Sequence, residues 1–382
     1  MKQKLKLILF AAPLLMLSLQ GCGTKQIQQS NYSFATTYHN RSSSDFFCYR
    51  SLEGDYGTTA ILDYESMNNV SLCNKPNCKH NKNDCVIKRL NGNTPMFGEE
   101  CIYYFVDDNP YIKQNDEGKS EWVYHSELCR YDLKTDIEKS LLSVEFEVAN
   151  NYYGCMLYDD MIYFIGHRYS SSSDENSAMI SATNTSGEMK LYAVHLPDMQ
   201  ITDLGDLYDM PELRKIYPLA PNSGEVYMKG LFDNKIYFNV GFVIEENGQY
   251  NYHFYVTYYD LTDGTYHGTP EDYEHIDFAA VSYASDDYLV ICREAAAEVY
   301  KKGSDQPVIL KNPCFNQYAD VTVYDDVLFY YDKAFDLNSG NVRQLDFMNE
   351  KEVVAKYGDS FIIADPGMQS GFEKIPAEQL MK

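Results

Sequence analysis

Three cysteines and one histidine lie close together in one polar segment, in the order Cys73, Cys78, His80 and Cys85. Three thiolates and one imidazole form a donor set that suits tetrahedral zinc. Cys78 and His80 are two residues apart, so in an extended chain both side chains point to the same side. A zinc ion held by all four groups would have no open coordination position. The predicted metal site is therefore structural and not catalytic.

A disulfide between two of these cysteines is the alternative to zinc. The segment reads C-x4-C-x-H-x4-C, which differs from the C-x2-C pairs of many zinc sites. Exported proteins often use their cysteines in disulfides, and the third thiol would then stay reduced or pair elsewhere. The spacing is compatible with three states of the segment: a zinc site, a disulfide, or neither.

Five aromatic or imidazole residues are candidates for contact with a ligand, because they lie in or beside long segments between predicted strands. They are Tyr111, Trp122, His167, Tyr169 and Tyr250. Aromatic rings in such positions can stack on sugars or anchor a protein partner. Most of the chain's 35 tyrosines fall within predicted strands, where they are expected to pack in the core.

Paired carboxylates are expected to form turns and not an acid/base pair. The pairs are Asp159–Asp160, Asp286–Asp287 and Asp325–Asp326. Aspartate bonds the backbone of turns and tolerates unusual φ values. Asp132, Asp260 and Asp336 mark a second set of turns, without the twelve-residue spacing of an EF-hand. The sequence has no H-E-x-x-H, G-x-S-x-G or P-loop pattern, so no catalytic residue is predicted.

The N-terminus has the layout of a secretory signal peptide. Three lysines precede an apolar run, Leu7–Leu19, that is too short to span a bilayer. The run ends in "LSLQGC", which resembles the bacterial lipobox. The resemblance implies removal of residues 1–21 and a diacylglyceryl thioether on Cys22. Two acyl chains suffice for stable attachment to a membrane.

Cleavage at this point would leave a strongly acidic chain. It removes three lysines and no acidic residue, which leaves 29 basic and 56 acidic residues and a formal net charge of −27. Such a field repels nucleic acid and anionic lipid, and it attracts cations and cationic peptides. The sequence therefore excludes nucleic acid as a partner.

The cysteine count limits how many disulfides the chain can form. Nine of the ten cysteines remain besides Cys22, so at least one is outside any intramolecular disulfide. Cys101, Cys155 and Cys292 lie in apolar strand patterns. These three are expected to be small buried hydrophobic residues.

A repeat dominates the rest of the chain and decides the predicted fold. Its unit is a short strand, a turn with Asp or Gly, an aromatic strand, and then strands that meet at an Asp-containing turn. "GCMLYDDMIYFIG" and "VYMKGLFDNKIYFNVGF" are clear copies. Strands rich in Tyr, Phe, Ile and Val between such turns indicate β-structure. The aromatic second strand recurs at about 46–50, 102–106, 161–166, 235–240, 288–292, 327–331 and 360–364.

Recurring four-stranded units predict an all-β fold, a β-propeller of seven four-stranded antiparallel blades, with six as the alternative. Residues 1–21 would be the signal peptide, 22–44 the lipidated cysteine and a polar tether, and 45–382 a single propeller domain. The "IYF…LY…DL" phrasing resembles the YWTD-like and DUF5050-like propellers of lipoproteins from clostridial and related gut bacteria. The resemblance covers nearly the whole mature chain and concerns the fold alone.

Three long segments interrupt the repeat between the second and third strands of a unit, at 107–121, 167–189 and 243–250. In a propeller these connections emerge on the same face as the blade-to-blade connections. The cysteine segment is one of the latter. Four elaborations on one face predict that this face carries the function. The competing explanation is that surface loops lengthen at little cost.

The predicted protein is a lipoprotein anchored on the extracytoplasmic face of a bacterial cell membrane. Its propeller would bind a peptide, glycan or protein partner without catalysis, with structural zinc as the only expected cofactor. The alternative is a glycan-active lyase or hydrolase whose residues converge from several blades. A third possibility, a structural subunit of an envelope complex, predicts a contiguous exposed apolar patch. Propellers host many functions, so the fold does not choose among these.

Overall fold

The computed structural model describes most of the chain from residue 46 onward. The described residues are 46–51, 58–70, 85–90, 93, 95–98, 101–108, 111–114, 120–132, 134–135, 137–148, 154–171, 185–207, 225–246, 249–268, 278–348, 351–365 and 371–381. The predicted signal peptide, Cys22 and tether, and three residues of the cysteine segment (Cys73, Cys78 and His80), lie outside these ranges.

Three sheets follow the predicted unit of four consecutive antiparallel strands. The first contains β15 (Glu225–Phe232), β16 (Lys235–Glu246), β17 (Gln249–Asp260) and β18 (Thr265–His267). The second contains β19 (Ala280–Ala284), β20 (Tyr288–Arg293), β21 (Ala296–Lys301) and β22 (Val308–Lys311). The third contains β23 (Thr322–Tyr324), β24 (Val327–Tyr330), β25 (Lys333–Asp336) and β26 (Val342–Gln344).

Two further sheets elaborate this unit. One consists of β4 (Met96–Gly98), β5 (Cys101–Asp107), β8 (Ser126–Asp132) and β9 (Ile137–Val144). Between its second and third strands is a separate hairpin of β6 (Tyr111–Gln114) and β7 (Ser120–Val123). In the other, β10 (Glu147–Val148) and β11 (Cys155–Tyr158) share one side of β12 (Met161–Ser171), followed by β13 (Thr185–His195) and β14 (Gln200–Asp206).

Two three-stranded sheets come from the ends of the described chain. The first contains β1 (Phe46–Ser51), β2 (Thr58–Asp63) and β3 (Asn68–Val70), and helix α2 (Val86–Leu90) follows it. The last contains β27 (Glu352–Tyr357), β28 (Ser360–Ala364) and β29 (Glu373–Pro376), between the 3-10 helix η3 (Asp346–Met348) and α4 (Ala377–Met381). No helix among the described residues is long and apolar enough to cross a membrane.

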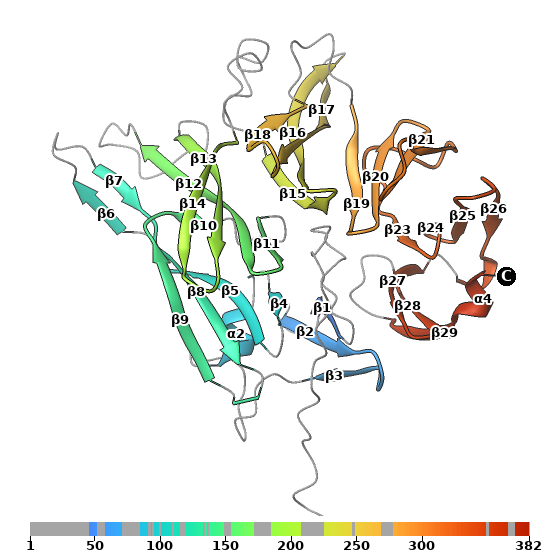
Figure 1. Ribbon diagram of the computed structural model, residues 1–382, viewed down its shortest axis with the longest axis horizontal. Coiled ribbons are helices and arrows are strands. Elements are labelled where there is room, and N and C mark those ends of the chain that lie inside the picture. Colours follow the sequence, from blue (N-terminus) through green and yellow to red (C-terminus); the bar gives the residue numbers. More distant parts are fainter. Residues whose placement is uncertain are drawn as a thin grey trace, which may run out of the picture.

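Figure 1 shows these sheets following one another around a ring, with the first strands β15, β19 and β23 toward its centre. A separate buried apolar cluster joins each of six neighbouring pairs of sheets. Second strands such as β20 and β28 are almost wholly buried, because a neighbouring sheet covers each face. This arrangement confirms the predicted all-β propeller with antiparallel sheets. The described residues form seven sheets of three to five strands, besides the β6–β7 hairpin.

The predicted turn chemistry is also present. Asp159, Asp325 and Asp326 have positive φ angles between the first and second strands of their sheets. Asp132 and Asp336 close turns between third and fourth strands through side-chain bonds to backbone N–H groups. Aspartate suits both roles because its short carboxylate bonds the local backbone and its φ can be positive.

Two predictions about individual segments differ from the structure. The predicted second strand at 46–50 is instead the first of its described sheet, since β1 pairs with β2 and β2 with β3. The three long segments predicted as loops are partly strand: β12 runs to Ser171 and β16 to Glu246, each paired with its successor. Their alternating Tyr, Val and polar residues extend the ladder outward, which a repeat-based boundary does not detect.

Candidate binding face

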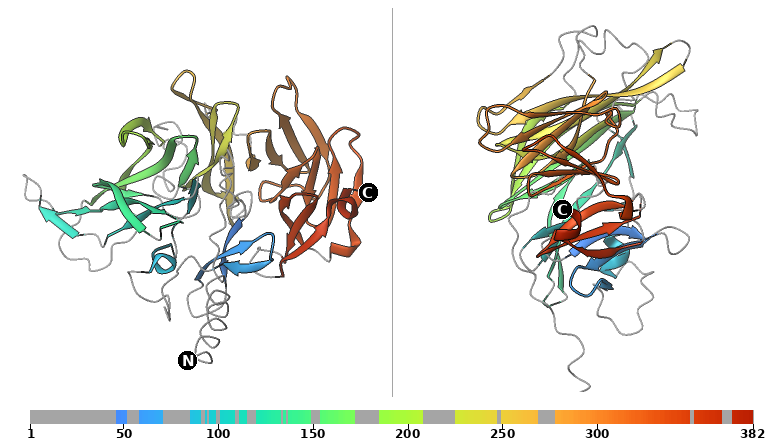
Figure 2. Two further views of the ribbon diagram at one scale, coloured as in Figure 1. Left: turned by 60° about the horizontal axis from the view of Figure 1, so that its bottom comes forward. Right: turned by 90° about the vertical axis from the view of Figure 1, so that its right-hand side faces the viewer.

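One end of the ring carries the extended hairpins. In each sheet the second strand ends where the third begins, and the fourth strand, antiparallel to the third, ends there too. The hairpins β6–β7, β12–β13 and β16–β17 and the sheet-to-sheet connections therefore share this end, which we call the hairpin face. Figure 2 shows the yellow β16–β17 hairpin projecting beyond its neighbours.

The predicted ligand-contact residues lie on these three hairpins. Tyr111 begins β6 and its side chain is 53% exposed. Trp122 pairs with Ile112 in the same hairpin. Tyr169 and Tyr250 lie near the ends of their hairpins in β12 and β17, where they pair with Gly187 and Glu245. The strands that carry them belong to three separate hairpins, all of which are at the hairpin face.

His167 is less exposed than its position beside a long insertion suggested. It lies in β12 between Glu147 of β10 and Met189 of β13. Burial lowers the pKa of its imidazole to about 4, so the ring is neutral at physiological pH. A neutral half-buried imidazole is a hydrogen-bonding group at the base of the hairpin and does not add positive charge to the face.

A segment that the sequence analysis did not single out also lies on this face. Residues 312–321, here called the crossing loop, connect β22 to β23. The buried ring of Phe315 fixes the loop in the apolar cluster between the two sheets. Its backbone exchanges bonds with the turn at Ala295, from Asn312 N to Ala295 O and from Ala295 N to Phe315 O, both 3.0 Å. The loop is therefore a well-anchored element.

Gln317 links the crossing loop to a third sheet, besides the two that the loop connects. Its Oε1 accepts a bond from the backbone N–H of Phe254 in β17 at 2.9 Å. Its Nε2 donates to the hydroxyl of Tyr318 at 3.1 Å and lies 3.3 Å from Nδ1 of His253. The Gln317 side-chain amide therefore connects the crossing loop to the β16–β17 hairpin through hydrogen bonds.

Aromatic rings surround this link. His253 stacks on Phe278 with ring centres 4.4 Å apart. Phe254 makes edge contacts with Tyr227 at 5.9 Å and with Tyr318 at 6.0 Å. Tyr318 is nevertheless 57% exposed, among the highest values for a large apolar side chain in the described structure. A rigidly held aromatic ring with an open face suits stacking against a ligand.

A buried cation lies on the inner strand of the same sheet. The register of β15 on β16 shifts between Met228 and Gly230, which makes Lys229 the bulged residue. Lys229 is only 9% exposed, and burial lowers the pKa of its ammonium group. Bulges turn a side chain away from the regular alternation of a strand, and they are common beside functional sites.

Asp320 is near enough to this lysine to act on its charge, and it acts on Tyr331 of another sheet as well. The charge of Asp320, in the crossing loop, partly offsets the lowering of the Lys229 pKa. Tyr331 has its pKa raised by burial, with smaller contributions from Glu352 and Asp320. Tyr331 also has φ of 48°, an unfavourable value for a bulky residue that persists at sites with a special geometry. We call Lys229, Asp320, Tyr331 and Glu352 the inner polar group.

The inner polar group and Tyr318 share one short loop, because Asp320 follows Tyr318 by two residues. Together they offer a buried ammonium donor, two carboxylate acceptors, a phenol and an exposed ring. Such a set can bind a partly polar ligand through hydrogen bonds and stacking. The sequence showed no linear motif, since the residues come from four segments. Two sequence features could have indicated this group of residues: a lysine within an inner strand, and a tight turn at Tyr331 that contains no glycine.

Cys85 is the one described member of the predicted cysteine set. Cys85 is fully buried directly before α2, and Arg89 of that helix reaches sheet β4-β5-β8-β9. Arg89 Nη1 lies 2.5 Å from Glu138 Oε1, and Nη2 lies 3.4 Å from the sulfur of Cys129. The predicted buried cysteines Cys101, Cys155 and Cys292 are at most 2% exposed, as expected.

One group of described residues has donor atoms close enough for a metal ion, namely Asp260, Asp263 and His267. All lie at the turn from β17 to β18, at the end opposite the hairpin face. Asp263 already accepts bonds from Thr265 and His267, and Asp260 accepts one from Thr262 N. Turn formation accounts for these residues.

Comparison with known proteins yields a fold likeness only. No family model matches the chain, and no curated protein does. Among solved structures, the β-propeller domain of the Trilobed protease from Pyrococcus furiosus is 11% identical, with 93% of this chain and 94% of that one covered and a TM-score of 0.37. An oligogalacturonate lyase in complex with manganese is 10% identical, with 94% and 93% covered and a TM-score of 0.42.

The nidogen/laminin complex gives 9% identity, 88% and 94% coverage and a TM-score of 0.30. These values are too low to transfer a ligand, an activity or a partner. The propeller assignment therefore rests on the sheets of this chain, their order and the clusters between them.

Proposed function

We propose that this protein is an extracytoplasmic recognition protein that binds a peptide, glycan or protein partner on its hairpin face. The observation that carries the proposal is the crossing loop. It holds Tyr318 exposed, with its hydroxyl bonded to Gln317, and it carries Asp320, whose charge acts on the buried Lys229. Rigid aromatic anchors beside a few convergent polar groups are the usual composition of binding sites.

The attachment of this domain to the cell belongs to the same proposal. The "LSLQGC" segment supports lipidation at Cys22, with residues 23–44 as a tether that lifts the propeller from the membrane. The repeat supports kinship with the YWTD-like and DUF5050-like lipoprotein propellers of clostridial gut bacteria, and a seven-bladed ring. Structural zinc or a disulfide would close the segment from Cys73 to Cys85.

Tyr318→Ala tests the binding face directly. The purified full-length chain is first screened on arrays of glycans and of peptides, and affinity for the best ligand is then measured by titration. Loss of a central aromatic anchor costs about 2 kcal/mol, which corresponds to roughly 30-fold weaker binding. We therefore expect Tyr318→Ala to weaken binding by about that factor.

Ile137→Ala is the matched control. Ile137 is also exposed, by 51%, but it begins the fourth strand β9 at the end opposite the hairpin face. This variant should bind within about twofold of the parent protein. Equal losses in the two variants, or none in Tyr318→Ala, would place the ligand elsewhere. Chemical conversion of an array ligand would instead support the glycan-active alternative, with the inner polar group as its first candidate centre.

A further inference from the structure

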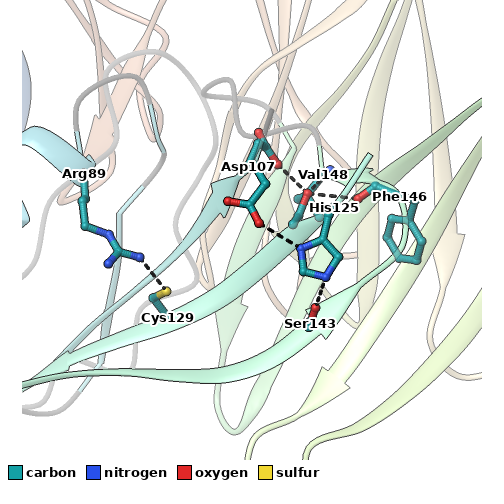
Figure 3. Close-up of polar contacts among 9 residues, drawn as sticks. Arg89, Asp107, His125, Cys129, Ser143, Phe146 and Val148 are labelled. Atoms are coloured by element: carbon teal, nitrogen blue, oxygen red, sulfur yellow. Dashed lines mark hydrogen bonds and ion pairs between the residues drawn. The ribbon is translucent and has the colours of Figure 1, made fainter. Parts of the chain in front are cut away.

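A serine, a histidine and an aspartate form a hydrogen-bonded chain on the sheet that contains β5, β8 and β9. Ser143 Oγ lies 2.5 Å from His125 Nε2, and His125 Nδ1 lies 3.2 Å from Asp108 Oδ2. Figure 3 shows Ser143 at the Nε2 end of the His125 ring. No linear motif marks these residues, which come from three strand ends.

Strand registry puts the three side chains on one side of the sheet. Asp108 N donates to His125 O at 2.9 Å, so these two residues are directly opposed. Ser143 is opposite Glu127, two residues beyond His125 in β8. Side chains two residues apart in a strand share a face, and opposed residues share it too. The alignment is therefore a property of the backbone ladder.

The adjacent residues fix this ladder from the other side. Ser126 and Asp107 point to the opposite face, where the Ser126 hydroxyl donates to the Asp107 carboxylate. Ser126 Oγ also lies 3.0 Å from Phe146 O and accepts from Val148 N at 3.1 Å. Because the hydrogen bonds of Ser126 hold its side chain on one face, the side chain of the preceding residue, His125, points to the other face, toward Asp108 and Ser143.

The donor and acceptor roles follow from the chemistry of the groups. A carboxylate only accepts hydrogen bonds, so Nδ1 of His125 must carry the proton that it donates to Asp108. In the neutral ring Nε2 is then an acceptor, and the Ser143 hydroxyl donates to it. This is the arrangement in which an imidazole can take the proton of an attacking hydroxyl while a carboxylate fixes its tautomer.

We propose that Ser143 is an activated nucleophile and that Asp108, His125 and Ser143 form an acyl-transfer site for esters. Ser143 Oγ attacks the ester carbonyl as its proton moves to His125 Nε2. The carbon–oxygen bond to the alcohol then breaks, and the alcohol leaves with that proton. A water molecule attacks the acyl-serine in the same way, which releases the carboxylic acid and restores the hydroxyl.

The exposure of the site defines the substrate class. The side chain of Asp108 is 68% exposed and that of His125 is 32% exposed, so an ester carried on a large molecule can reach Ser143. A solvated carboxylate stabilises the imidazolium less than a buried one does, because water screens the charges. The site therefore fits reactive esters and not amides. Outer-edge N–H groups of β9, the last strand of its sheet, can bond a tetrahedral oxyanion.

Labelling with a fluorophosphonate probe tests this proposal on the full-length chain. We expect the probe on the peptide that contains Ser143, no label there in Ser143→Ala, and about 100-fold slower labelling in His125→Gln. Ser140→Ala is the matched control, since Ser140 is an exposed serine on the same strand and face. It should label and hydrolyse p-nitrophenyl acetate like the parent protein.

Two results would overturn the proposal. One is no label on Ser143, and the other is labelling of Ser143 that His125→Gln leaves unchanged. Thermal unfolding of each variant shows that the comparison is made between folded chains. Tyr318 is in the crossing loop and not on the sheet that contains Ser143. Ligand binding through Tyr318 should therefore persist in Ser143→Ala, which distinguishes the proposed acyl-transfer activity from the proposed recognition function.

Discussion

At the scale of single residues, Lys229 shows how a buried cation can cost stability. Its pKa is lowered in the folded chain because burial disfavours the ammonium ion. The folded chain therefore holds this proton less tightly than the unfolded chain does. The cost is fully present below the folded pKa, and it fades as pH rises toward the unfolded value of about 10.4.

Lys229→Met should consequently raise the free energy of unfolding near neutral pH by about 1–3 kcal/mol, since a buried charge is replaced by an apolar chain of similar length. The gain should shrink as pH approaches 10. Urea unfolding at several pH values measures both effects, with exposed Lys302→Met as the control. A less stable Lys229→Met protein at neutral pH would show that Asp320 more than compensates the buried charge.

The same substitution should weaken binding on the hairpin face. A stability gain together with a loss of affinity is the usual signature of a functional group held at an energetic cost. The inner polar group escaped prediction for a related reason. Lys229 and Asp320 are 91 positions apart in the sequence, and only the ring of sheets brings their two segments together.

At the scale of elements, the sequence predicted what local chemistry determines. Six of the seven aromatic segments, for example 288–292 and 327–331, are second strands, because alternating apolar residues between Asp turns leave few other structures. The hairpin extensions and the crossing loop were missed. β16 continues through "VIEE" and pairs there with the start of β17, which a repeat-based boundary does not reveal. The position of the crossing loop depends on contacts with Ala295 and Phe254.

The cysteine segment is the element whose covalent state a direct measurement can assign. Zinc predicts about one metal ion per chain, lost in both Cys78→Ser and His80→Ala. A disulfide predicts no metal, about two thiols missing from the denatured thiol count, and no effect of His80→Ala on that count. Metal analysis and thiol titration of protein purified without added metal distinguish them. A full thiol count without metal would reject both.

At the scale of the whole molecule, closure of the ring joins the two ends of the described chain. Leu62 and Tyr64 of the first sheet pack in one buried cluster with Val354, Ala355 and Ile362 of the last sheet. Lys374 Nζ also donates to Tyr64 O at 3.3 Å. Contacts between residues about 300 positions apart carry a high entropic cost of loop closure. The other sheet interfaces can offset this cost if all the sheets fold as one cooperative unit.

A double-mutant cycle measures this closure. Leu62→Ala should cost about 2–5 kcal/mol and Ile362→Val about 0.5–1.5 kcal/mol, since both side chains are buried. Because they share one cluster, the double variant should deviate from additivity by at least about 0.5 kcal/mol in urea unfolding. Leu62→Ala combined with Leu310→Ala is the control, because Leu310 lies in the distant cluster between sheets β19–β22 and β23–β26. Additive effects for both pairs would mean that the first and last sheets are energetically independent and that the ring is open in solution.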